Sequence, residues 1–548
     1  MSLFRIFSFF IIFSTLLCLG QGCKYSATKE TRQVFHYNEP TGIASLDPAF
    51  AKNQSIMWAT HQLYSTLVEA DSNLKMKPLL AKSWTFSADR KTIRFLLRND
   101  VFFHDHDAFP QGKGRLMTAS DVVFSFQRLI DPATASPGAW IFNGRVDSLQ
   151  PFTAVNDTIF ELRLQKPFSP IIGVLSNQYC SIVAPEAVKK YGKDFRRHPC
   201  GTGPFQFHSW DEGTSLVFWK NPHYFERDAF QKPLPYLDAV QVYFYDHKST
   251  EFLMFQQGEI DFMNDIDPSF KDELLSKKGI LRDAWKNKVQ LKKHPYLNTE
   301  YLGILMDSHA VKNNPLRSVL IRRAINYGFD KQKMMLYLRN SIGRAAESGF
   351  IPAGLPSFDA KKVPGYSYDP EKAKQLLKSS GYDAATSEPI KLLTIPTYAD
   401  LANYIARELE DIGLKVQVEA IPKGLLLEQT ATQKAPFFRA SWIADYPEAE
   451  NYLSVFYGKN PAPPNYTRYH NDAFDHLFDL AMETENDSLR YAYYQAMDRM
   501  IIQDAPIVPL WYDEVIHLIQ PWMQGFEPNG LNMLELRRAR KGDDLKIS

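Results

Sequence analysis

The chain alternates between segments with the two-residue period of β-strands and segments with the spacing of amphipathic helices. Residues 92–98 alternate apolar and polar side chains, which predicts a strand with one buried face. The same alternation recurs at 160–164 and at 240–244. These positions predict three half-buried strands in the first half of the chain.

Helices in the second half have clear ends. Asp369 and Pro370 open a helix, because Asp caps helix N-termini and Pro fits the first turn, and Gly381 ends it. A strand, a helix and a second strand follow within residues 392–418. This order and length predict a βαβ unit, and hence an α/β domain in the carboxyl half.

Two extended, Pro-containing segments lie far apart in the sequence, at Lys286–Asn298 and Asp504–Val515. We expect both to be strands that cross between two lobes and pair with each other. A hinge of paired strands would let the two lobes close on a ligand.

Composition and charge restrict the class of protein. The 548 residues are 45% apolar, enough for two or three domains with well-filled cores. Lys and Arg number 63 against 62 Asp and Glu, so the formal net charge of +1 gives no electrostatic basis for binding nucleic acid. The basic segment Arg537–Lys541 is expected to be solvated.

Residues 1–22 have the pattern of a signal peptide, with the apolar run Ile6–Leu19 followed by small residues. Gly22-Cys23 resembles a lipobox, in which a lipid is attached to the cysteine thiol. We therefore expect Cys23 to anchor the mature chain to a membrane, with simple secretion as the alternative. The rest of the sequence contains no second apolar run of about 18 residues, the length of a membrane-spanning helix.

Cys180 and Cys200 are the two further cysteines of the mature chain. Disulfides persist outside the cytoplasm, so these residues form either a bridge or two buried thiols. The densest group of metal-binding residue types is His104–Asp107. Consecutive residues of an extended chain point to alternate sides, so this segment predicts a polar loop and no metal site.

Local signatures of catalysis are absent from the sequence. It contains no G-x-S-x-G, H-E-x-x-H, G-x-x-x-x-G-K-[ST] or G-x-G-x-x-G motif, and no spacing of carboxylates singles out an acid–base pair. Gly201-Thr202-Gly203 precedes Pro204, which lacks a backbone donor, so it is a poor phosphate cradle. We predict that the protein is not an enzyme.

The segment Arg439–Tyr446, with the sequence RASWIADY, precedes a loop containing Pro and Asn. Its composition predicts a strand that ends in a loop. On composition alone, Asp445 is a solvated loop carboxylate or a helix cap, and Trp442 is a core aromatic.

Seven short segments, in a fixed order, carry a resemblance that spans nearly the whole mature chain. They are SLDPA (45–49), LAKSWTFSADRKTIRFLLRNDVFFHD (80–105), TASDVVFSF (118–126), HPCGTGPF (198–205), QQGEID (256–261), RRAINYGFDKQK (322–333) and YDPEKAKQLLKSSGY (368–382). The ordered set resembles the extracellular solute-binding protein family 5, whose members bind dipeptides, oligopeptides and nickel.

The resemblance implies a ligand site on the RASWIADY segment. In oligopeptide-binding members, a strand-end Trp-x-x-Asp sets its Asp against the α-amino group of the peptide, and Trp442-Ile443-Ala444-Asp445 matches that pattern. Arg439 matches the position of an Arg that meets the carboxylate of the ligand; pairing with a protein carboxylate is the alternative. Ala444 and Tyr446 flank the same Asp and are expected to line the site.

Further contacts are implied elsewhere in the chain. Gly42-Ile43-Ala44 matches the place where the family lays an extended backbone edge beside the ligand. Trp511 and Tyr512 fall near the second crossing strand, where aromatic side chains would wall the cleft; a core position is the alternative. The segment 395–398 lacks the Arg of dipeptide-binding members, which favours longer peptides.

The resemblance implies an α/β fold of the periplasmic-binding-protein type, in its large three-domain form with two lobes and a hinge. Lobe I would comprise 23–71, 179–288 and 506–548, an inserted small domain 72–178, and lobe II 289–505. The implied function is to bind short peptides between the lobes and to deliver them to the permease of an ABC importer, as a lipid-anchored monomer without a cofactor. A binder of nickel chelates, sugars or haem-like ligands, and a cleft hydrolase, are the alternatives.

Overall fold

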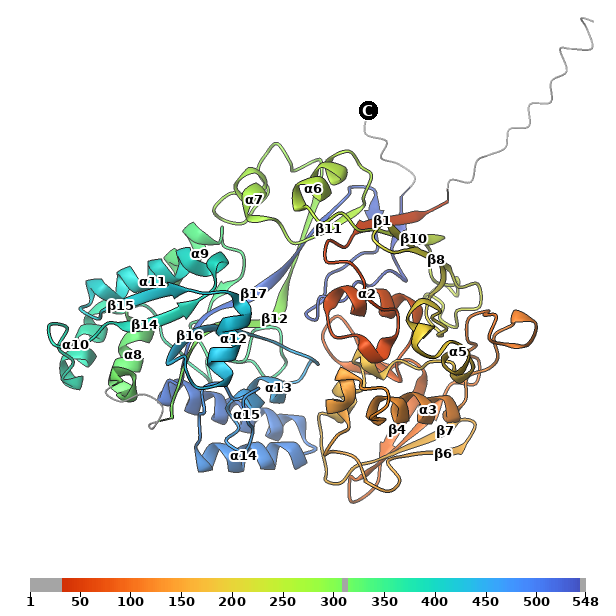
Figure 1. Ribbon diagram of the computed structural model, residues 1–548, viewed down its shortest axis with the longest axis horizontal. Helices are drawn as coiled ribbons and strands as arrows, with labels where there is room; N and C mark the ends of the chain where they lie inside the picture. The colour runs from red at the N-terminus through yellow and green to blue at the C-terminus, as the bar shows by residue number, and fades with distance from the viewer. Residues whose placement is uncertain (1–31, 308–313, 543–548) are drawn as a thin grey trace, which may run out of the picture.

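The computed structural model describes residues 32–307 and 314–542. The predicted signal peptide and Cys23 lie outside these residues. Figure 1 shows an α/β protein with two lobes, joined by two long strands that run from one lobe to the other.

A large mixed sheet extends through both lobes of the described chain. Its eleven strands include β13 (Arg344–Ala345), which pairs with β17, and ten that follow in the order β15 (Val416–Ala420), β14 (Ile390–Thr394), β16 (Phe437–Ile443), β12 (Gln290–Ile304), β17 (Ile507–Ile519), β11 (Phe262–Asn264), β1 (Val34–Asn38), β10 (Ala239–Tyr243), β9 (Ser215–Lys220) and β8 (Phe205–Asp211). We call the half with β1 and β8–β11 lobe I, and the half with β14–β16 lobe II.

The long strands β12 and β17 confirm the predicted pair of strands that cross between the lobes. They pair antiparallel along most of their length, from Gln290 opposite Ile519 to Gly303 opposite Ile507. One end of β17 pairs with β11 in lobe I, and one end of β12 pairs with β16 in lobe II. The register shifts between Pro295 and Thr299, so the pair is bulged where it passes between the lobes.

Lobe II contains the predicted βαβ unit. The strands β14 and β15 are parallel and are connected through α11 (Ala399–Asp411). The predicted helix is α10 (Pro370–Ser380): the Asp369 side chain accepts from the backbone N–H of Lys372, and Gly381 follows in the left-handed conformation with φ of 73°. Helices α8–α11 cover one face of the lobe II strands and α13–α15 the other.

A second sheet forms a small domain beside lobe I. Its strands are β4 (Ala81–Phe86), β5 (Thr92–Leu97), β7 (Ile159–Arg163) and β6 (Phe152–Asn156), in that order, and one hydrophobic core continues from it into lobe I. The three strands predicted in the first half of the chain are β5, β7 and β10, and each ends one residue earlier than expected. A hairpin of β2 (Val68–Ala70) and β3 (Met76–Pro78) lies between lobe I and the small domain in the sequence.

The remaining helices complete the two lobes (Figure 1). Those of lobe I and the small domain are α2 (Gln54–Leu63), α3 (Ala119–Ile130), α4 (Ile171–Val174), α5 (Pro185–Tyr191), α6 (Lys248–Gln256) and α7 (Pro268–Leu274). Those of lobe II are α8 (Val319–Tyr327), α9 (Lys331–Leu338), α10, α11, α12 (Lys423–Ala431), α13 (Glu450–Leu453), α14 (Asp472–Glu483) and α15 (Asp487–Asp504). No helix in the described ranges is both long and apolar enough to cross a bilayer.

Gly201 and Gly203 allow close packing against the end of α2. A Cβ atom at Gly201 would lie 2.3 Å from the backbone oxygen of Leu63, and one at Gly203 would lie 2.4 Å from its carbonyl carbon. The Gly-Thr-Gly segment is therefore required for packing, in agreement with its poor fit to a phosphate loop.

The structure decides between the two alternatives for the cysteines and overturns one expectation. Cys180 and Cys200 are buried free thiols, and each sulfur lies against a different carbonyl, that of Val174 or of His104. The basic segment Arg537–Lys541 is not a solvated tail: Arg537 is only 8% exposed and Lys541 pairs with the buried Asp261 at 2.8 Å.

Candidate ligand-binding site

Asp445 follows the end of β16 and is open to solvent, yet protein surrounds it closely. The resulting desolvation raises the pKa of its carboxyl, and a hydrogen bond from Asn451 opposes that change. Within residues 32–307 and 314–542, no ion pair is formed by this carboxylate. A solvent-accessible anionic group that has no cation partner in the described chain is suited to receive one from a ligand.

Asn451, in α13, holds the Asp445 loop and was not singled out by the sequence. It is 4% exposed. Its Oδ1 accepts from the indole Nε1 of Trp442 at 2.9 Å and from the backbone N of Asp445 at 3.3 Å, and its Nδ2 donates to Asp445 Oδ2 at 3.3 Å. An Asn in the first turn of a short helix resembles an ordinary helix-start residue, so only the folded loop reveals this role.

The same loop also contacts the small domain and the core that this domain shares with lobe I. The Nδ2 of Asn177 donates to the backbone oxygen of Asp445 at 2.9 Å. The ring of Tyr446 stacks on Trp140 with centroids 6.1 Å apart and packs into the lobe I core, while its hydroxyl donates to Glu450. Asp445 therefore lies where the two lobes meet, beside Trp442, Ala444 and Tyr446.

Arg439 pairs with a protein carboxylate, the alternative left open by the sequence. Its Nη2 donates to Glu300 on β12, and its guanidinium lies 3.8 Å from the ring centroid of Tyr398. Burial raises the pKa of Glu300, and the charge of Arg439 opposes the shift. The buried Nε of Arg439 makes no hydrogen bond within the described chain, so one donor of this side chain is unused.

The aromatic pair Trp511 and Tyr512 occupies core positions in this structure. In the register of the sheet, Trp511 lies opposite Glu300 and Tyr512 opposite Thr299. Trp511 is fully buried, with Arg339 over its ring, and the Tyr512 hydroxyl donates to the backbone of Gly349 at 2.6 Å.

Ile43 is likewise buried, in the core of lobe I. The structure therefore groups the other expected residues into an Asp445 cluster and an Arg439–Trp511 cluster, whereas Ile43 belongs to the core of lobe I.

One edge of β16 is largely unpaired by strands of the described chain. The strand β12 pairs with it from Phe437 to Ile443, whereas β14 meets it only through Leu393 opposite Phe438. An extended peptide can hydrogen-bond to such an edge without regard to its side chains.

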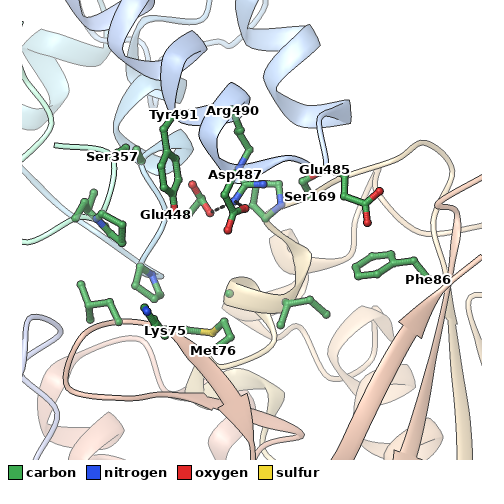
Figure 2. A pocket seen from close by; sticks show the side chains of 18 of the residues that line it. Lys75, Met76, Phe86, Ser169, Ser357, Glu448, Glu485, Asp487, Arg490 and Tyr491 are labelled. Carbon is green, nitrogen blue, oxygen red and sulfur yellow. Dashed lines mark hydrogen bonds and ion pairs between the residues drawn. The ribbon is translucent and has the colours of Figure 1, made fainter. Parts of the chain in front are cut away.

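A cavity of about 690 Å³ lies near Asp445, and Pro447, two residues after it in the chain, is part of its wall. Figure 2 shows Glu448, Arg490 and Tyr491 on the lobe II side, facing Lys75 and Met76 of the hairpin across the cavity. Asp445 and Arg439 do not line it. The cavity gives room between the lobes near the Asp445 loop, but its polar wall is already paired, since Arg490 contacts Glu448 at 3.4 Å and Asp487 at 2.7 Å.

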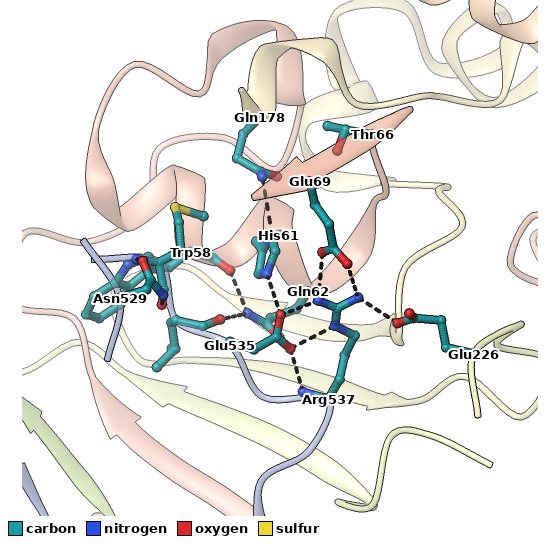
Figure 3. A network of polar contacts seen from close by, with 12 residues as sticks. Trp58, His61, Gln62, Thr66, Glu69, Gln178, Glu226, Asn529, Glu535 and Arg537 are labelled. Carbon is teal, nitrogen blue, oxygen red and sulfur yellow. Dashed lines mark hydrogen bonds and ion pairs between the residues drawn. The ribbon is translucent and has the colours of Figure 1, made fainter. Parts of the chain in front are cut away.

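A smaller cavity of about 400 Å³ in lobe I adjoins a network around Arg537. Figure 3 shows the Arg537 guanidinium between Glu69, Glu226 and Glu535, at 2.7, 2.6 and 2.5 Å. Burial alone would raise the pKa values of Glu69 and Glu535, but the charge of Arg537 lowers both. Each carboxylate faces the same cation, which indicates a structural network.

The segment His104–Asp107 is a loop whose side chains have separate partners. His104 Nε2 lies 3.0 Å from the Gly203 oxygen, Asp105 binds Lys113, and Asp107 binds Tyr191. Nowhere in the described ranges do three His, Cys, Asp or Glu side chains converge as metal ligands would.

Two α/β lobes, crossing strands between them and, at their junction, a carboxylate with no cation partner among the described residues define a bilobal substrate-binding protein. The chain belongs to the bacterial extracellular solute-binding proteins of family 5, whose model matches residues 75–464. Proteins of this family are the extracytoplasmic substrate-binding components of ABC importers.

Relatives show how far the likeness extends. The glutathione-binding protein GsiB of Shigella dysenteriae is 26% identical over 495 residues, 89% of this chain and 90% of that protein. The Helicobacter pylori protein DppA, solved with the peptide STSA, is 25% identical with a TM-score of 0.73, covering 93% of this chain and 99% of that one. Campylobacter jejuni NikZ, solved with Ni(L-His), has the same fold at 20% identity and a TM-score of 0.69, covering 92% and 97%.

Proposed function

We propose that this protein captures short peptides with a free amino terminus between its two lobes and delivers them to the membrane permease of an ABC importer. The observation that carries the proposal is Asp445, a carboxylate without a cation at the junction of the lobes. The α-ammonium is the charge that all unblocked peptides share, so one carboxylate selects peptides without reading their side chains.

The rest of the peptide would lie along β16. The free edge beyond Phe438 offers backbone groups to an extended ligand. Arg439 lies six positions before Asp445, and β16 ends between them at Ile443. An extended path of that length spans roughly 20 Å. A peptide of about three to five extended residues would bridge the two charges at about 3.3 Å per residue, with the ligand carboxylate competing with Glu300 for the guanidinium.

Relatives support a ligand of this size but include another chemistry. GsiB is named for glutathione and DppA was solved with a tetrapeptide, whereas NikZ was solved with a nickel chelate. The described residues form no metal cluster, so a nickel ligand would have to bring its own chelator. The carboxylate of Asp445 favours a peptide, whose ammonium it can pair.

Calorimetry with matched peptides tests the proposal. Native protein should bind tetra-alanine and bind its N-acetylated form poorly, and Asp445→Ala should weaken binding of the free form by about 2–5 kcal/mol, the range for removing one partner of a buried charge pair. Asp383→Ala, which changes an exposed Asp on another loop of lobe II, is the control. Equal affinity for free and acetylated peptide would overturn the proposal. Mass spectrometry of the ligand that co-purifies would separate mixed peptides from a single metallophore.

We further propose that Cys23 carries a lipid that tethers a monomer to the membrane, and that the domains follow the segments expected from the sequence. The motivating feature is Gly22-Cys23 after an apolar run. Replacement of Cys23 by Ser should release the protein into the soluble extracytoplasmic fraction. Unchanged membrane partitioning together with an unchanged mass of the mature amino terminus would contradict lipid attachment.

A further inference from the structure

Asn451 is linked to both residues of the Trp-x-x-Asp pattern. We propose that Asn451 positions the Asp445 carboxylate for the ammonium group of a ligand, by binding Oδ2 and leaving Oδ1 free; this inference rests on the proposed function. The Nδ2–Oδ2 distance is 3.3 Å, and in the described chain no hydrogen bond reaches Asp445 Oδ1. One carboxylate oxygen is thus fixed, and the other remains available to a ligand.

The chemistry of the amide explains why Asn occupies this position. Its carbonyl oxygen has two acceptor sites, which the Trp442 indole and the Asp445 backbone N–H occupy, and its amino group supplies the donor for Oδ2. An Asp at the same position would accept but not donate, and a Leu of similar shape would do neither. Asn451 therefore fixes the end of β16, the loop backbone and the carboxylate together.

A second contact holds the same loop from outside lobe II. The backbone oxygen of Asp445 accepts from Asn177, at the end of the small domain, whose own Oδ1 accepts from the backbone N of Tyr179 at 3.1 Å. The Asp445 residue is thus held by an amide of lobe II at its carboxylate and by an amide of the small domain at its carbonyl. Asn177 leaves the carboxylate untouched, so the orientation of that group depends on Asn451.

The other charged and titratable groups around Asp445 cannot replace the hydrogen bond that Asn451 donates to it. On the lobe II side they are Glu450, whose pKa is raised by burial and lowered by the charge of Arg145, and Tyr452, whose pKa is raised by burial. Across from lobe II, burial and the charge of Asp445 raise the pKa of Tyr179 to about 12, so it is neutral at physiological pH. Within the described chain none of the three donates a hydrogen bond to Asp445, and Glu450 adds negative charge when ionised.

The pH dependence of binding reports the effect of Asn451. A cationic ligand binds the ionised form of Asp445, so affinity is lost as pH falls through the pKa of that carboxyl. Burial raises this pKa and the Asn451 hydrogen bond lowers it. Removal of the hydrogen bond must raise it further, which moves the loss of affinity to higher pH.

Calorimetric titration with tetra-alanine between pH 4.5 and pH 7 tests the inference, because the peptide ammonium stays charged throughout this range. In Asn451→Leu, the midpoint of the affinity loss should rise by about one to two pH units, the equivalent of one charge-assisted hydrogen bond. Asn221→Leu, the same change at a buried Asn of lobe I that donates to Gly203, should leave the midpoint unchanged. Asn451→Ser, which is smaller and cannot clash, replaces the leucine variant if that protein does not fold.

The outcomes separate the two proposals. The side chain of Asp445→Asn cannot ionise. This variant should bind tetra-alanine weakly, and its affinity should not fall further as the pH is lowered. If Asp445→Asn binds tetra-alanine as tightly as the native protein, the proposed function fails. If Asp445→Asn loses affinity while Asn451→Leu and Asn451→Ser keep the native midpoint, the positioning role of Asn451 is wrong and the proposed function stands.

Discussion

Arg537 in lobe I and Asp445 between the lobes are both charged groups crowded by protein, but their surroundings are opposite. Arg537 faces three carboxylates and the Tyr224 hydroxyl, all within hydrogen-bonding distance. Asp445 faces one neutral amide and, within the described chain, no cation. A buried charge with every partner supplied by the protein stabilises the fold, whereas a solvent-accessible charge without a partner is available to a ligand.

Arg439 lies between these two extremes. It is paired with Glu300, as Arg537 is paired with its carboxylates, yet its Nε is unused and it lies on the strand that leads to Asp445. Experiments that disturb each of the three charges would show which of them belong to the fold and which to the ligand.

The largest effect is expected for Arg537→Met. Loss of the guanidinium leaves Glu69, Glu226 and Glu535 without their common cation, so the free energy of unfolding should fall by about 3–5 kcal/mol. Urea denaturation measures this change. Arg538→Met, at the exposed neighbouring position, should stay within about 0.5 kcal/mol of the native protein. Equal stability of the two variants would contradict the conclusion that the Arg537 network stabilises the fold.

Arg439→Ala tests whether the intermediate case contacts ligand. At one peptide length, amidation of the peptide carboxylate and Arg439→Ala should each reduce affinity by about 1.5–3 kcal/mol, and together by no more than either alone. Glu300→Gln should strengthen binding of the free acid, since the guanidinium is no longer shared. A calorimetric series from dipeptide to hexapeptide provides the measurement. Additivity at every length would make Arg439 a purely structural residue.

The pH dependence of stability should have opposite signs at the two sites. Glu69 and Glu535 have lowered pKa values in the folded state, so their contribution is present above the unfolded value of 4.5 and is lost as pH falls through the folded value. Asp445 has a raised pKa, so its ionisation above 3.8 disfavours the ligand-free fold.

Asp445→Asn should therefore be slightly more stable than the native protein at pH 7, by less than about 1 kcal/mol because solvent reaches the group. The gain should disappear as pH falls toward 3.8, where the native carboxyl is protonated as well. Thermal unfolding across pH measures both trends, and a variant that is less stable at pH 7 would contradict this account.

The smallest effect is expected at the thiols, which neither site uses. Cys180 and Cys200 are free and buried, and burial raises the pKa of both. A reductant should not change the melting temperature, and a thiol reagent should label the two cysteines only after denaturation. Two results would contradict this account. One is labelling of the folded protein as fast as that of an exposed thiol, and the other is a melting temperature that falls on reduction.

Features with local causes were predictable from the sequence. Asp369, Pro370 and Gly381 define both ends of α10 within twelve positions, and the βαβ unit and the crossing strands follow from periodicity. The position of Asp445 at the end of a strand followed from the family pattern. Each of these depends on residues that are neighbours in the chain.

The partners of the charged residues were not predictable. Arg439 and Glu300 are 139 positions apart and Arg537 and Glu69 are 468 apart, so only the register of the sheet and the packing of the lobes decide that they meet. For the same reason Arg537 was expected in solvent and Cys180 and Cys200 were considered as a bridge. Asn451 is close to Asp445 in sequence, but its contacts depend on how the loop turns.

The place of β17 in the sheet has a consequence for biosynthesis. This strand lies between β12 and β11, so it connects the lobe II strands to those of lobe I, yet it consists of residues 507–519 and follows every other strand of the sheet in the chain. A ribosome-bound chain that has not reached Ile507 cannot complete either lobe. We expect the nascent protein to remain largely unfolded until synthesis is nearly finished, the condition in which a polypeptide can be threaded through a narrow export channel.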